Sequence, residues 1–308
     1  MKIKLLLALL AGATLAAGAA ESTLRVYYIG NSVTDTIRYK PLAELAATRG
    51  VKLEWGRHMI PGAPLEWLHG HAEEGFREKP YGGWRLALTG FAWDAVSFQP
   101  FDRSFTSTNK NGEAVGDLDL ITAWAKLAAE KNPNVRILVY ARWPRMRSGG
   151  QPFKFNKDAY DPAKPGNGFD LAKLDPWTQC WEAGYDPATR KGSNESREYF
   201  EKLHAAVVAN TRFLKQPAEL VKVGHALAAL DAEMRAGKVP GYTTAWQFYK
   251  DGIHFNETGS YLVGCVYFAQ LLRLNPTGLP TAPYGKVDEK LAPLLQKVAW
   301  ETVQKLTP

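Results

Sequence analysis

The chain has 308 residues, of which 45% are hydrophobic and 22% charged, with 27 Gly and 19 Pro. These proportions are typical of a globular protein and exclude the disordered, collagenous and coiled-coil classes. Its 38 Lys and Arg exceed its 31 Asp and Glu, which gives a formal net charge of +7. Two cysteines cannot build a disulfide framework, and no Cys-x-x-Cys pair indicates a structural zinc site.

The first twenty residues have the features of a secretory signal peptide. Lys2 and Lys4 precede an apolar run that begins at Leu5, and small residues follow up to Ala20. No later stretch approaches the ~20 apolar residues of a membrane span. We therefore expect residues 1–20 to be removed on export, so that two of the positive charges are lost and the mature protein is periplasmic or secreted.

Short apolar runs alternate with amphipathic segments along the rest of the chain. Five runs predict buried strands: 24–29, 51–55, 95–98, 136–140 and 220–223. The amphipathic segments predict one helix that ends at Gly50, one at 118–131, and later ones at about 197–214, 257–273 and 287–306. Strands that alternate with helices indicate a parallel sheet covered on both faces. We therefore expect an α/β fold, a three-layer α/β/α sandwich around a mostly parallel five-stranded sheet.

Residues 143–195 do not follow this pattern. They combine Pro, Gly and charged residues with many aromatic residues and show no clear periodicity. A loop of this length within a compact domain is usually functional or disordered, and the aromatic content argues against disorder. We interpret residues 21–308 as a single domain with a long aromatic-rich insertion at about 143–195.

Two polar motifs lie at positions where chemistry is expected. Gly30-Asn31-Ser32 ends the first predicted strand, at the sheet edge where open α/β folds bind ligands. Asp251 and His254 come just before the predicted helix 257–273. A histidine can remove the proton of a serine hydroxyl, and an aspartate can fix its tautomer and stabilise the imidazolium. Each motif alone is common in turns and surface loops, but together they predict a catalytic Ser32, His254 and Asp251.

These motifs resemble those of the SGNH, or GDSL-like, hydrolase superfamily. Ile29-Gly30-Asn31-Ser32-Val33-Thr34 is similar to the block that carries the nucleophilic serine, although the family usually has Asp where this chain has Asn31. Asp251 and His254 match the last block. Gly62 is the best match to the oxyanion-hole glycine, and Gln99 stands where the family usually has Asn.

The resemblance implies a flavodoxin-like SGNH hydrolase fold and a serine-dependent mechanism. The oxyanion would be held by the amides of Ser32 and Gly62 and by the side chain of Gln99. Such a mechanism needs no metal and no cofactor. His58, His69 and His71 lack an accompanying carboxylate or cysteine pattern, so we interpret them as loop or groove residues and not as metal ligands.

Secreted members of this superfamily commonly remove acyl groups from polysaccharides or hydrolyse lipids. Aromatic faces stack on sugar rings, so the insertion favours a glycan, with Trp143, Trp177 and Trp181 as candidate contacts, although core packing is the alternative for each ring. Arg145 and Arg147 follow the fourth predicted strand and would suit a uronate or sulfate of an acidic glycan, unless they form structural ion pairs.

We therefore expect a carbohydrate O-acetylesterase-like enzyme whose partner is an acylated glycan. Two alternatives stay open. A carbohydrate-binding protein that lost activity would explain Asn31 and Gln99, and a lipase or lysophospholipase would show an aliphatic cleft beside Ser32. Nucleic acid is not expected as a partner, because Lys and Arg are scattered and the chain is exported. Cys180 and Cys265 are compatible with either a disulfide or buried thiols.

Overall fold

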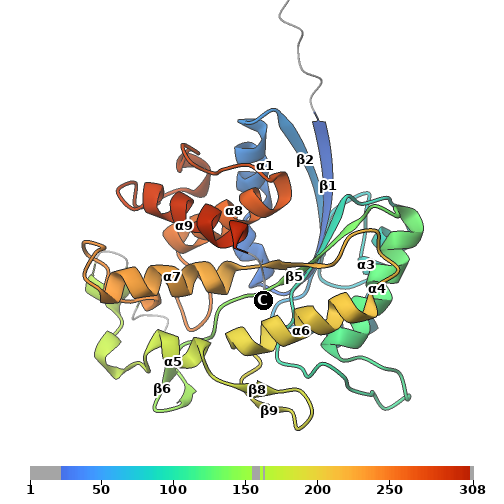
Figure 1. Cartoon of the computed structure of the whole chain (residues 1–308), viewed down its shortest axis with the longest axis horizontal. Coiled ribbons are helices and arrows are strands. Elements are labelled where there is room, and N and C mark those ends of the chain that lie inside the picture. Colours follow the sequence, from blue (N-terminus) through green and yellow to red (C-terminus); the bar gives the residue numbers. More distant parts are fainter. Residues whose placement is uncertain (1–21, 155–159, 162–163, 306–308) are drawn as a thin grey trace, which may run out of the picture.

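The structure is a computed structural model that describes residues 22–154, 160–161 and 164–305. The expected signal peptide, residues 1–20, lies outside the described residues. Six strands form the central sheet, in the order β10-β5-β4-β1-β2-β3. Its strands β1, β2 and β5 are labelled in Figure 1. The strands are β1 (Ser22–Gly30), β2 (Val51–Met59), β3 (Phe76–Arg77), β4 (Ala95–Phe98), β5 (Arg136–Tyr140) and β10 (Glu219–Val221).

All neighbouring strands run parallel except β3, which pairs antiparallel with β2 at the edge of the sheet. The predicted mostly parallel sheet is confirmed, and the five predicted strands are its five parallel ones. The sixth strand, β3, has two residues and is too short to leave a periodic pattern. Residues 26–29 of β1 are fully buried, because helices cover this central strand on both faces.

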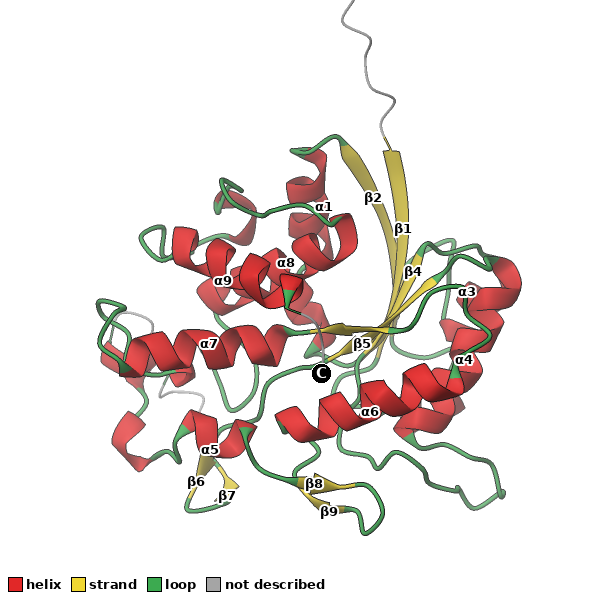
Figure 2. Cartoon of the chain, viewed as in Figure 1, coloured by secondary structure: helices red, strands yellow, loops and turns green. Residues whose placement is uncertain are grey.

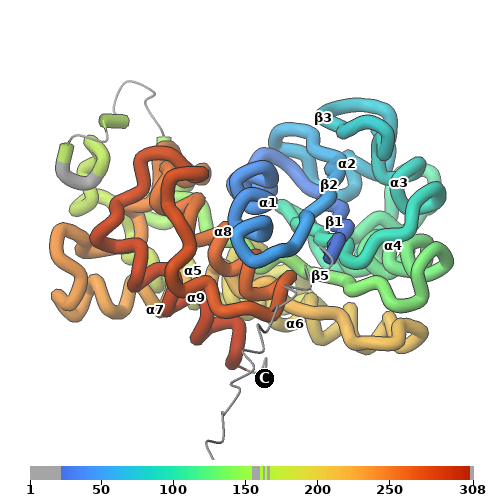
Figure 3. Tube along the Cα trace, turned by 90° about the horizontal axis from the view of Figure 1, so that it is seen from above, coloured from blue at the N-terminus to red at the C-terminus, as the bar shows by residue number. Residues whose placement is uncertain are grey.

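Two groups of helices form the outer layers (Figure 2). One face carries α1 (Tyr39–Ala47), α7 (Val223–Arg235), α8 (Glu257–Leu272) and α9 (Ala292–Gln304). The other carries α2 (Leu65–Gly70), α3 (Trp84–Gly90), α4 (Asp117–Lys131) and α6 (Arg197–Asn210). Seen from above, α1 and α8 lie on the opposite side of β1 from α3 and α4 (Figure 3). The α/β/α sandwich expected from the sequence is therefore confirmed.

The predicted helices are present with shifted ends, and four helices, α2, α3, α5 and α7, were missed. Helix α6 ends at Asn210 and not at about 214, and helix α9 begins at Ala292 and not at about 287. Helix α7 begins at Val223, which the apolar pattern assigned to the last strand. Within the described residues, no helix is both long and apolar enough to cross a membrane.

The segment 143–195 forms short elements: β6 (Arg147–Ser148), β7 (Gln151–Pro152), η3 (Pro165–Gly168), η4 (Leu171–Lys173), α5 (Trp177–Trp181), β8 (Tyr185–Asp186) and β9 (Lys191–Gly192). The strands pair as two small hairpins. Aromatic residues of this segment belong to the same hydrophobic core as the sheet and its helices. Three further short helices are η1 (Thr34–Ile37), η5 (Ala245–Phe248) and η6 (Ala282–Tyr284).

Candidate active site

The loop after β1 holds Ser32 at the carboxyl edge of the sheet, beside the end of β4. The strand order reverses here, because β2 lies on one side of β1 and β4 on the other, and such a crevice is where open α/β sheets bind ligands. A Cβ on Gly30 would lie 2.0 Å from Thr34 Oγ1 and 2.8 Å from Gln99 Cβ, so only glycine fits. The Thr34 N–H donates to the Asn31 carbonyl at 2.9 Å and closes the turn that presents Ser32.

Asp251, His254 and Ser32 form a continuous hydrogen-bonded chain. Asp251 Oδ2 lies 2.8 Å from His254 Nδ1, and His254 Nε2 lies 2.8 Å from Ser32 Oγ. The carboxylate can only accept, so Nδ1 carries the hydrogen and Nε2 is left to accept the Ser32 proton. The structure therefore brings these three predicted residues together in the order that proton removal from a serine requires.

The loop 251–254 fixes the carboxylate as well as the imidazole. Asp251 Oδ1 accepts the N–H groups of Ile253 at 2.8 Å and His254 at 2.7 Å. Burial raises the pKa of the Asp251 carboxyl, but the hydrogen bonds from the side chain and N–H of His254 and from Ile253 outweigh burial and leave this pKa below its usual range. Asp251 is therefore ionised over the pH range in which a histidine acts as a base.

Trp143 packs against the loop 251–254 and binds its backbone. Its Nε1 donates to the Ile253 carbonyl at 2.6 Å, and its ring stacks on Phe255 with centroids 3.7 Å apart. The Met146 N–H donates to the Gly252 carbonyl at 2.8 Å. Residues on both sides of His254 are thus anchored to the segment that follows β5.

Two backbone N–H groups face no internal acceptor near Ser32. Gly62 sits in an exposed turn with φ +69, which glycine adopts readily, and the Ala63 N–H closes this turn on the Ile60 carbonyl at 3.1 Å. Across the described chain, neither the Ser32 N–H nor the Gly62 N–H donates a hydrogen bond. Both groups therefore keep a free hydrogen, and their donation to an oxyanion stays a prediction.

The side chain of Gln99 is held by hydrogen bonds to the loop after β1 and to Pro100. Its Oε1 accepts from the Asn31 N–H at 3.1 Å and from Thr34 Oγ1 at 3.0 Å, and its Nε2 donates to the Pro100 carbonyl at 2.8 Å. A backbone N–H only donates and a carbonyl only accepts, so these partners fix which end of the amide is oxygen. Gln99 is buried, and the Pro100 carbonyl accepts one of its two Nε2 hydrogens, so its role as an oxyanion donor stays a prediction.

The three tryptophans expected to contact a sugar are core residues instead. Trp143 and Trp181 are 0% exposed and Trp177 is 1% exposed, so none offers a ring face to a ligand. Trp177 donates from Nε1 to Tyr249 Oη at 3.0 Å, and Trp181 stacks on Phe200. Core packing, the alternative for each ring, is therefore correct, and the prediction of sugar stacking by these residues is wrong.

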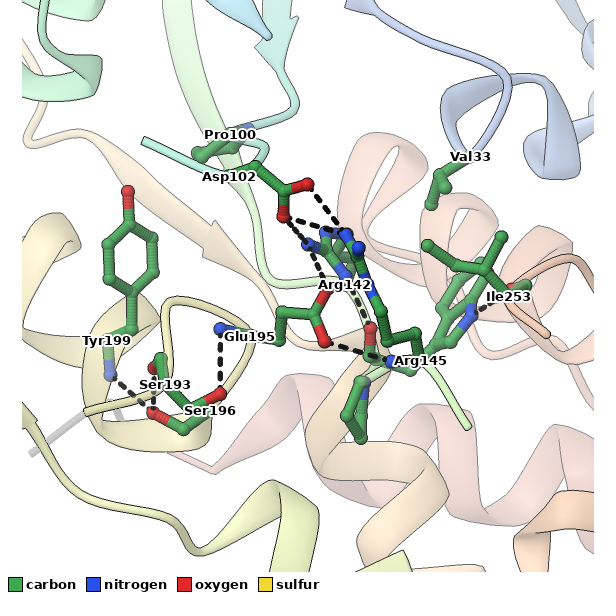
Figure 4. Close-up of polar contacts among 12 residues, drawn as sticks. Val33, Pro100, Asp102, Arg142, Arg145, Ser193, Glu195, Ser196, Tyr199 and Ile253 are labelled. Carbon is green, nitrogen blue, oxygen red and sulfur yellow. Dashed lines mark hydrogen bonds and ion pairs between the residues drawn. The ribbon is translucent and has the colours of Figure 1, made fainter. Parts of the chain in front are cut away.

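Arg145 belongs to a neutral cluster of four charged side chains, with Arg142, Asp102 and Glu195 (Figure 4). Its Nη2 contacts both Asp102 oxygens at 2.7 and 2.8 Å, and its Nε lies 2.6 Å from Glu195. Arg142 pairs with Glu195 at 2.9 Å, and the Phe101 ring lies under both guanidinium groups. Arg145 is thus paired, which corrects its expected role as a free anion receptor.

The cluster borders the loops that carry the Ser32–His254 pair. Arg145 lies between Trp143 and Met146, which both bond to the loop 251–254. Burial raises the pKa of Glu195, but Arg142 and Arg145 outweigh burial and hold this pKa below its usual range. Asp102 and Glu195 were missed from the sequence, since no local motif marks a partner 43 or 50 residues from Arg145.

Arg147 lies apart from Ser32. Its Nη1 donates to the Gly150 carbonyl at 2.9 Å, and among the described residues no carboxylate pairs with it. It lines a cavity of about 340 Å³ together with Asp175, Gln179 and Ser193, and none of the loops that hold Ser32, Gly62 or His254 reaches this cavity.

The other histidines and the two cysteines considered in the sequence analysis make packing contacts and do not form a site. His58 is buried and places Nε2 3.1 Å from the Glu74 carbonyl, and burial lowers its pKa to about 4. His69 stacks on Trp84, and His71 stacks on a second tryptophan, Trp67. In the part of the chain that the structure describes, no group of three His, Cys, Asp or Glu residues could hold a metal ion. Cys180 and Cys265 are buried free thiols and form no bridge.

No protein-family model and no curated protein sequence matches the chain. Among solved structures, a DUF4886 family protein from Bacteroides uniformis matches with a TM-score of 0.54 and 16% identity, over 92% of this chain and 95% of that chain. A protein described as a GDSL-like lipase from Parabacteroides merdae matches with a TM-score of 0.41 and 14% identity, over 80% of this chain and 94% of that one. The periplasmic domain of a lipopolysaccharide acetyltransferase from Salmonella matches with a TM-score of 0.40 and 14% identity, over 82% and 83%. At this identity the first match shows a shared fold.

Proposed function

We propose that this chain is a secreted serine esterase of the SGNH type that removes acyl groups, acetyl above all, from a polysaccharide or oligosaccharide. The observation that carries the proposal is the hydrogen-bonded chain from Asp251 through His254 to Ser32, with 2.8 Å at each side-chain step. Export is supported by the charged, apolar and small-residue pattern of residues 1–20.

The proposed mechanism follows from the donors and acceptors of the site. His254 Nε2 takes the Ser32 proton while Oγ attacks the ester carbonyl, and the resulting oxyanion accepts the N–H groups of Ser32 and Gly62. Asp251 stabilises the imidazolium, which then protonates the departing alcohol. Water repeats the sequence on the acyl-enzyme, so that the acid is released and Ser32 recovers its proton.

A polar alcohol is favoured over a lipid by the surroundings of Ser32. The large hydrophobic side chains exposed among the described residues are Trp67, Phe76, Leu86, Phe213 and Leu274. None of them belongs to the loops that hold Ser32 or His254, and the neighbouring wall is the ionic pair of Arg145 and Asp102. A lipase needs a continuous aliphatic groove at this place, so a glycan suits the site better.

In this proposal Trp67 stacks on a sugar ring of the substrate, the contact expected from the tryptophans that are buried. It lies in α2, which begins just after the Gly62 turn, and 51% of its surface is exposed. The His71 ring covers one face at a centroid distance of 3.9 Å, which leaves the other face to a sugar ring. The sequence does not mark Trp67, because exposure, and not the number of aromatic residues, decides which ring can meet a ligand.

Arg145 is neutralised by Asp102 and Glu195, and Arg147 lines a cavity apart from Ser32, so neither side chain supports an acidic glycan over a neutral one. A binding protein without activity is the alternative class, and the hydrolysis experiment described next separates this class from an esterase.

The test is hydrolysis of p-nitrophenyl acetate by residues 21–308 and by the Ser32→Ala variant. We expect Ser32-dependent release of p-nitrophenol, and faster turnover of the acetyl than of the octanoyl ester. Ser148→Ala is the matched control, because its hydroxyl donates only to the Lys173 carbonyl on the surface. Equal rates for the wild type and Ser32→Ala would overturn the proposal, and binding of acetylated oligosaccharide without turnover would favour the binding protein.

A further inference from the structure

We propose that Asn31 is a positioning residue that sets the separation of the two oxyanion-binding N–H groups, those of Ser32 and Gly62. The inference rests on the proposed function, because it assigns a role within the same site. Asn31 touches no reacting atom, and it acts through the backbone on either side of it.

Asn31 bridges the two loops that carry these donors. It is 0% exposed, its Nδ2 donates to the Ala63 carbonyl at 3.1 Å, and its Oδ1 accepts the Val33 N–H at 3.0 Å. Ala63 directly follows Gly62, and Asn31 directly precedes Ser32. Each end of the bridge is therefore one residue away from one of the two donors.

Gln99 holds the same loop from the end of β4. Its Oε1 accepts the Asn31 N–H, and its Nε2 is tied to the Pro100 carbonyl, so the amide cannot turn without leaving a buried N–H unpaired. This anchor leaves the Asn31 side chain as the direct hydrogen-bonded link between the Ser32 loop and the Gly62 turn.

The geometry requires an amide at position 31. A carboxylate has no N–H, so the ionised side chain of an Asn31→Asp variant would place an oxygen opposite the Ala63 carbonyl oxygen, and two acceptors would face each other at about the separation of a hydrogen bond. The Gly62 turn, which is exposed and has no other direct link to the Ser32 loop among the hydrogen bonds of the described residues, would then move away from Ser32.

Such a movement has a specific kinetic consequence. An oxyanion donor must lie ~2.7–3.1 Å from the developing charge, and a displacement of about 1 Å costs on the order of 100-fold in rate. Gln99 is bonded to the Asn31 N–H and to Pro100, so it does not link the Ser32 loop to the Gly62 turn in place of the Asn31 side chain. Loss of the bridge therefore weakens transition-state stabilisation while ground-state binding of the ester is retained.

The experiment compares Asn31→Asp and Asn31→Ala with the wild type and with Asn134→Asp, an exposed residue that undergoes the same chemical change. The readouts are kcat and KM for p-nitrophenyl acetate and the Ki of phenylboronic acid, which forms a tetrahedral adduct with a serine Oγ. We expect kcat to fall about 10- to 100-fold in both Asn31 variants with KM within about twofold, and Ki to rise by a similar factor. Asn31→Ala separates loss of the bridge from the effect of an added charge.

The inference is overturned by an Asn31→Asp variant as active as the wild type, or by a loss of kcat that follows only the loss of folded protein measured by thermal unfolding. The proposed function fails separately, if wild-type hydrolysis does not depend on Ser32. The bridge is tested independently of activity by the ¹⁵N–¹H spectrum, where the Ser32 and Gly62 amide signals should shift in Asn31→Asp and stay in place in Asn134→Asp. Unshifted signals in Asn31→Asp would also contradict the bridge.

Discussion

His254 Nε2 lies 2.8 Å from Ser32 Oγ, although the two residues are 222 positions apart in the chain. One helix packing contact brings them together. Helix α8 begins three residues after His254, and it packs on η1, which begins two residues after Ser32. The serine and its base are therefore held by rigid elements, and their separation does not depend on a long flexible loop.

Replacing Asp251 by Asn should lower kcat by about 10³- to 10⁴-fold. The Asn amide can present an N–H to His254 Nδ1, which would favour the tautomer with a hydrogen on Nε2 and leave no acceptor for the Ser32 proton. The measurement is kcat for p-nitrophenyl acetate beside the far-ultraviolet circular dichroism of the variant. Asp186→Asn, an exposed aspartate outside the site, is the control, and a folded Asp251→Asn with more than a tenth of wild-type kcat would contradict the role of Asp251.

Replacing Glu195 by Gln should destabilise the protein by about 3–5 kcal/mol near neutral pH, because the buried Arg142 guanidinium loses its closest carboxylate. The folded pKa of Glu195 is lowered, so its contribution is present above the unfolded Glu pKa of about 4.3 and is lost as pH falls through the folded pKa. Urea unfolding at several pH values measures this difference. Glu182→Gln, which breaks the exposed pair with Arg197, should cost about 0–1 kcal/mol, and equal costs for both variants would count against the buried cluster.

Asp117 should make the protein less stable as pH rises towards neutrality. Burial raises the pKa of Asp117 to about 7, although the Tyr199 hydroxyl donates to its Oδ2. The unfolded chain gives up this proton near pH 4 and the folded chain only near 7, so this residue's contribution to stability falls between those values. Asp117→Asn should remove that fall and gain stability relative to the wild type by on the order of 1–3 kcal/mol between pH 5 and 8. Unfolding at pH 5 and pH 8 measures this difference. If the free energies of unfolding of the wild type and of Asp117→Asn change by the same amount between these two pH values, the prediction for Asp117 is wrong.

Trp67→Ala should raise KM for an acetylated oligosaccharide about 5- to 30-fold, as expected for the loss of one ring-stacking contact. Turnover of p-nitrophenyl acetate should stay unchanged, because this small ester does not reach the ring. Phe213→Ala is the control, since Phe213 is exposed to a similar extent outside the site loops. If KM for the oligosaccharide is the same in the wild type and in Trp67→Ala, the sugar does not stack on this residue.

The sequence was informative where structure depends on local pattern. The five parallel strands are apolar runs, and Ser32, Asp251 and His254 lie in short motifs whose residue types are dictated by the chemistry. Strand β3 was missed because two residues carry no period, and Val223 was misassigned because an apolar residue fits a strand end as well as a helix start.

The errors in the site concern long-range contacts. Whether Trp177 faces solvent or the core depends on Tyr249, 72 positions later, and whether Arg145 carries a free charge depends on Glu195, 50 positions later. None of these partners is close in the sequence, so composition and motif spacing leave them undetermined.

Covalent labelling of Ser32 by a fluorophosphonate tests the central claim most directly. In this reaction Ser32 Oγ bonds to phosphorus, fluoride leaves, and His254 takes the proton, so labelling depends on the same two atoms as ester hydrolysis. Mass spectrometry should find one adduct per chain on the peptide that contains Ser32, none in Ser32→Ala, and far slower labelling in His254→Ala. Continued hydrolysis of p-nitrophenyl acetate by the wild type with Ser32 unlabelled, or with the adduct on another residue, would contradict Ser32 as the nucleophile.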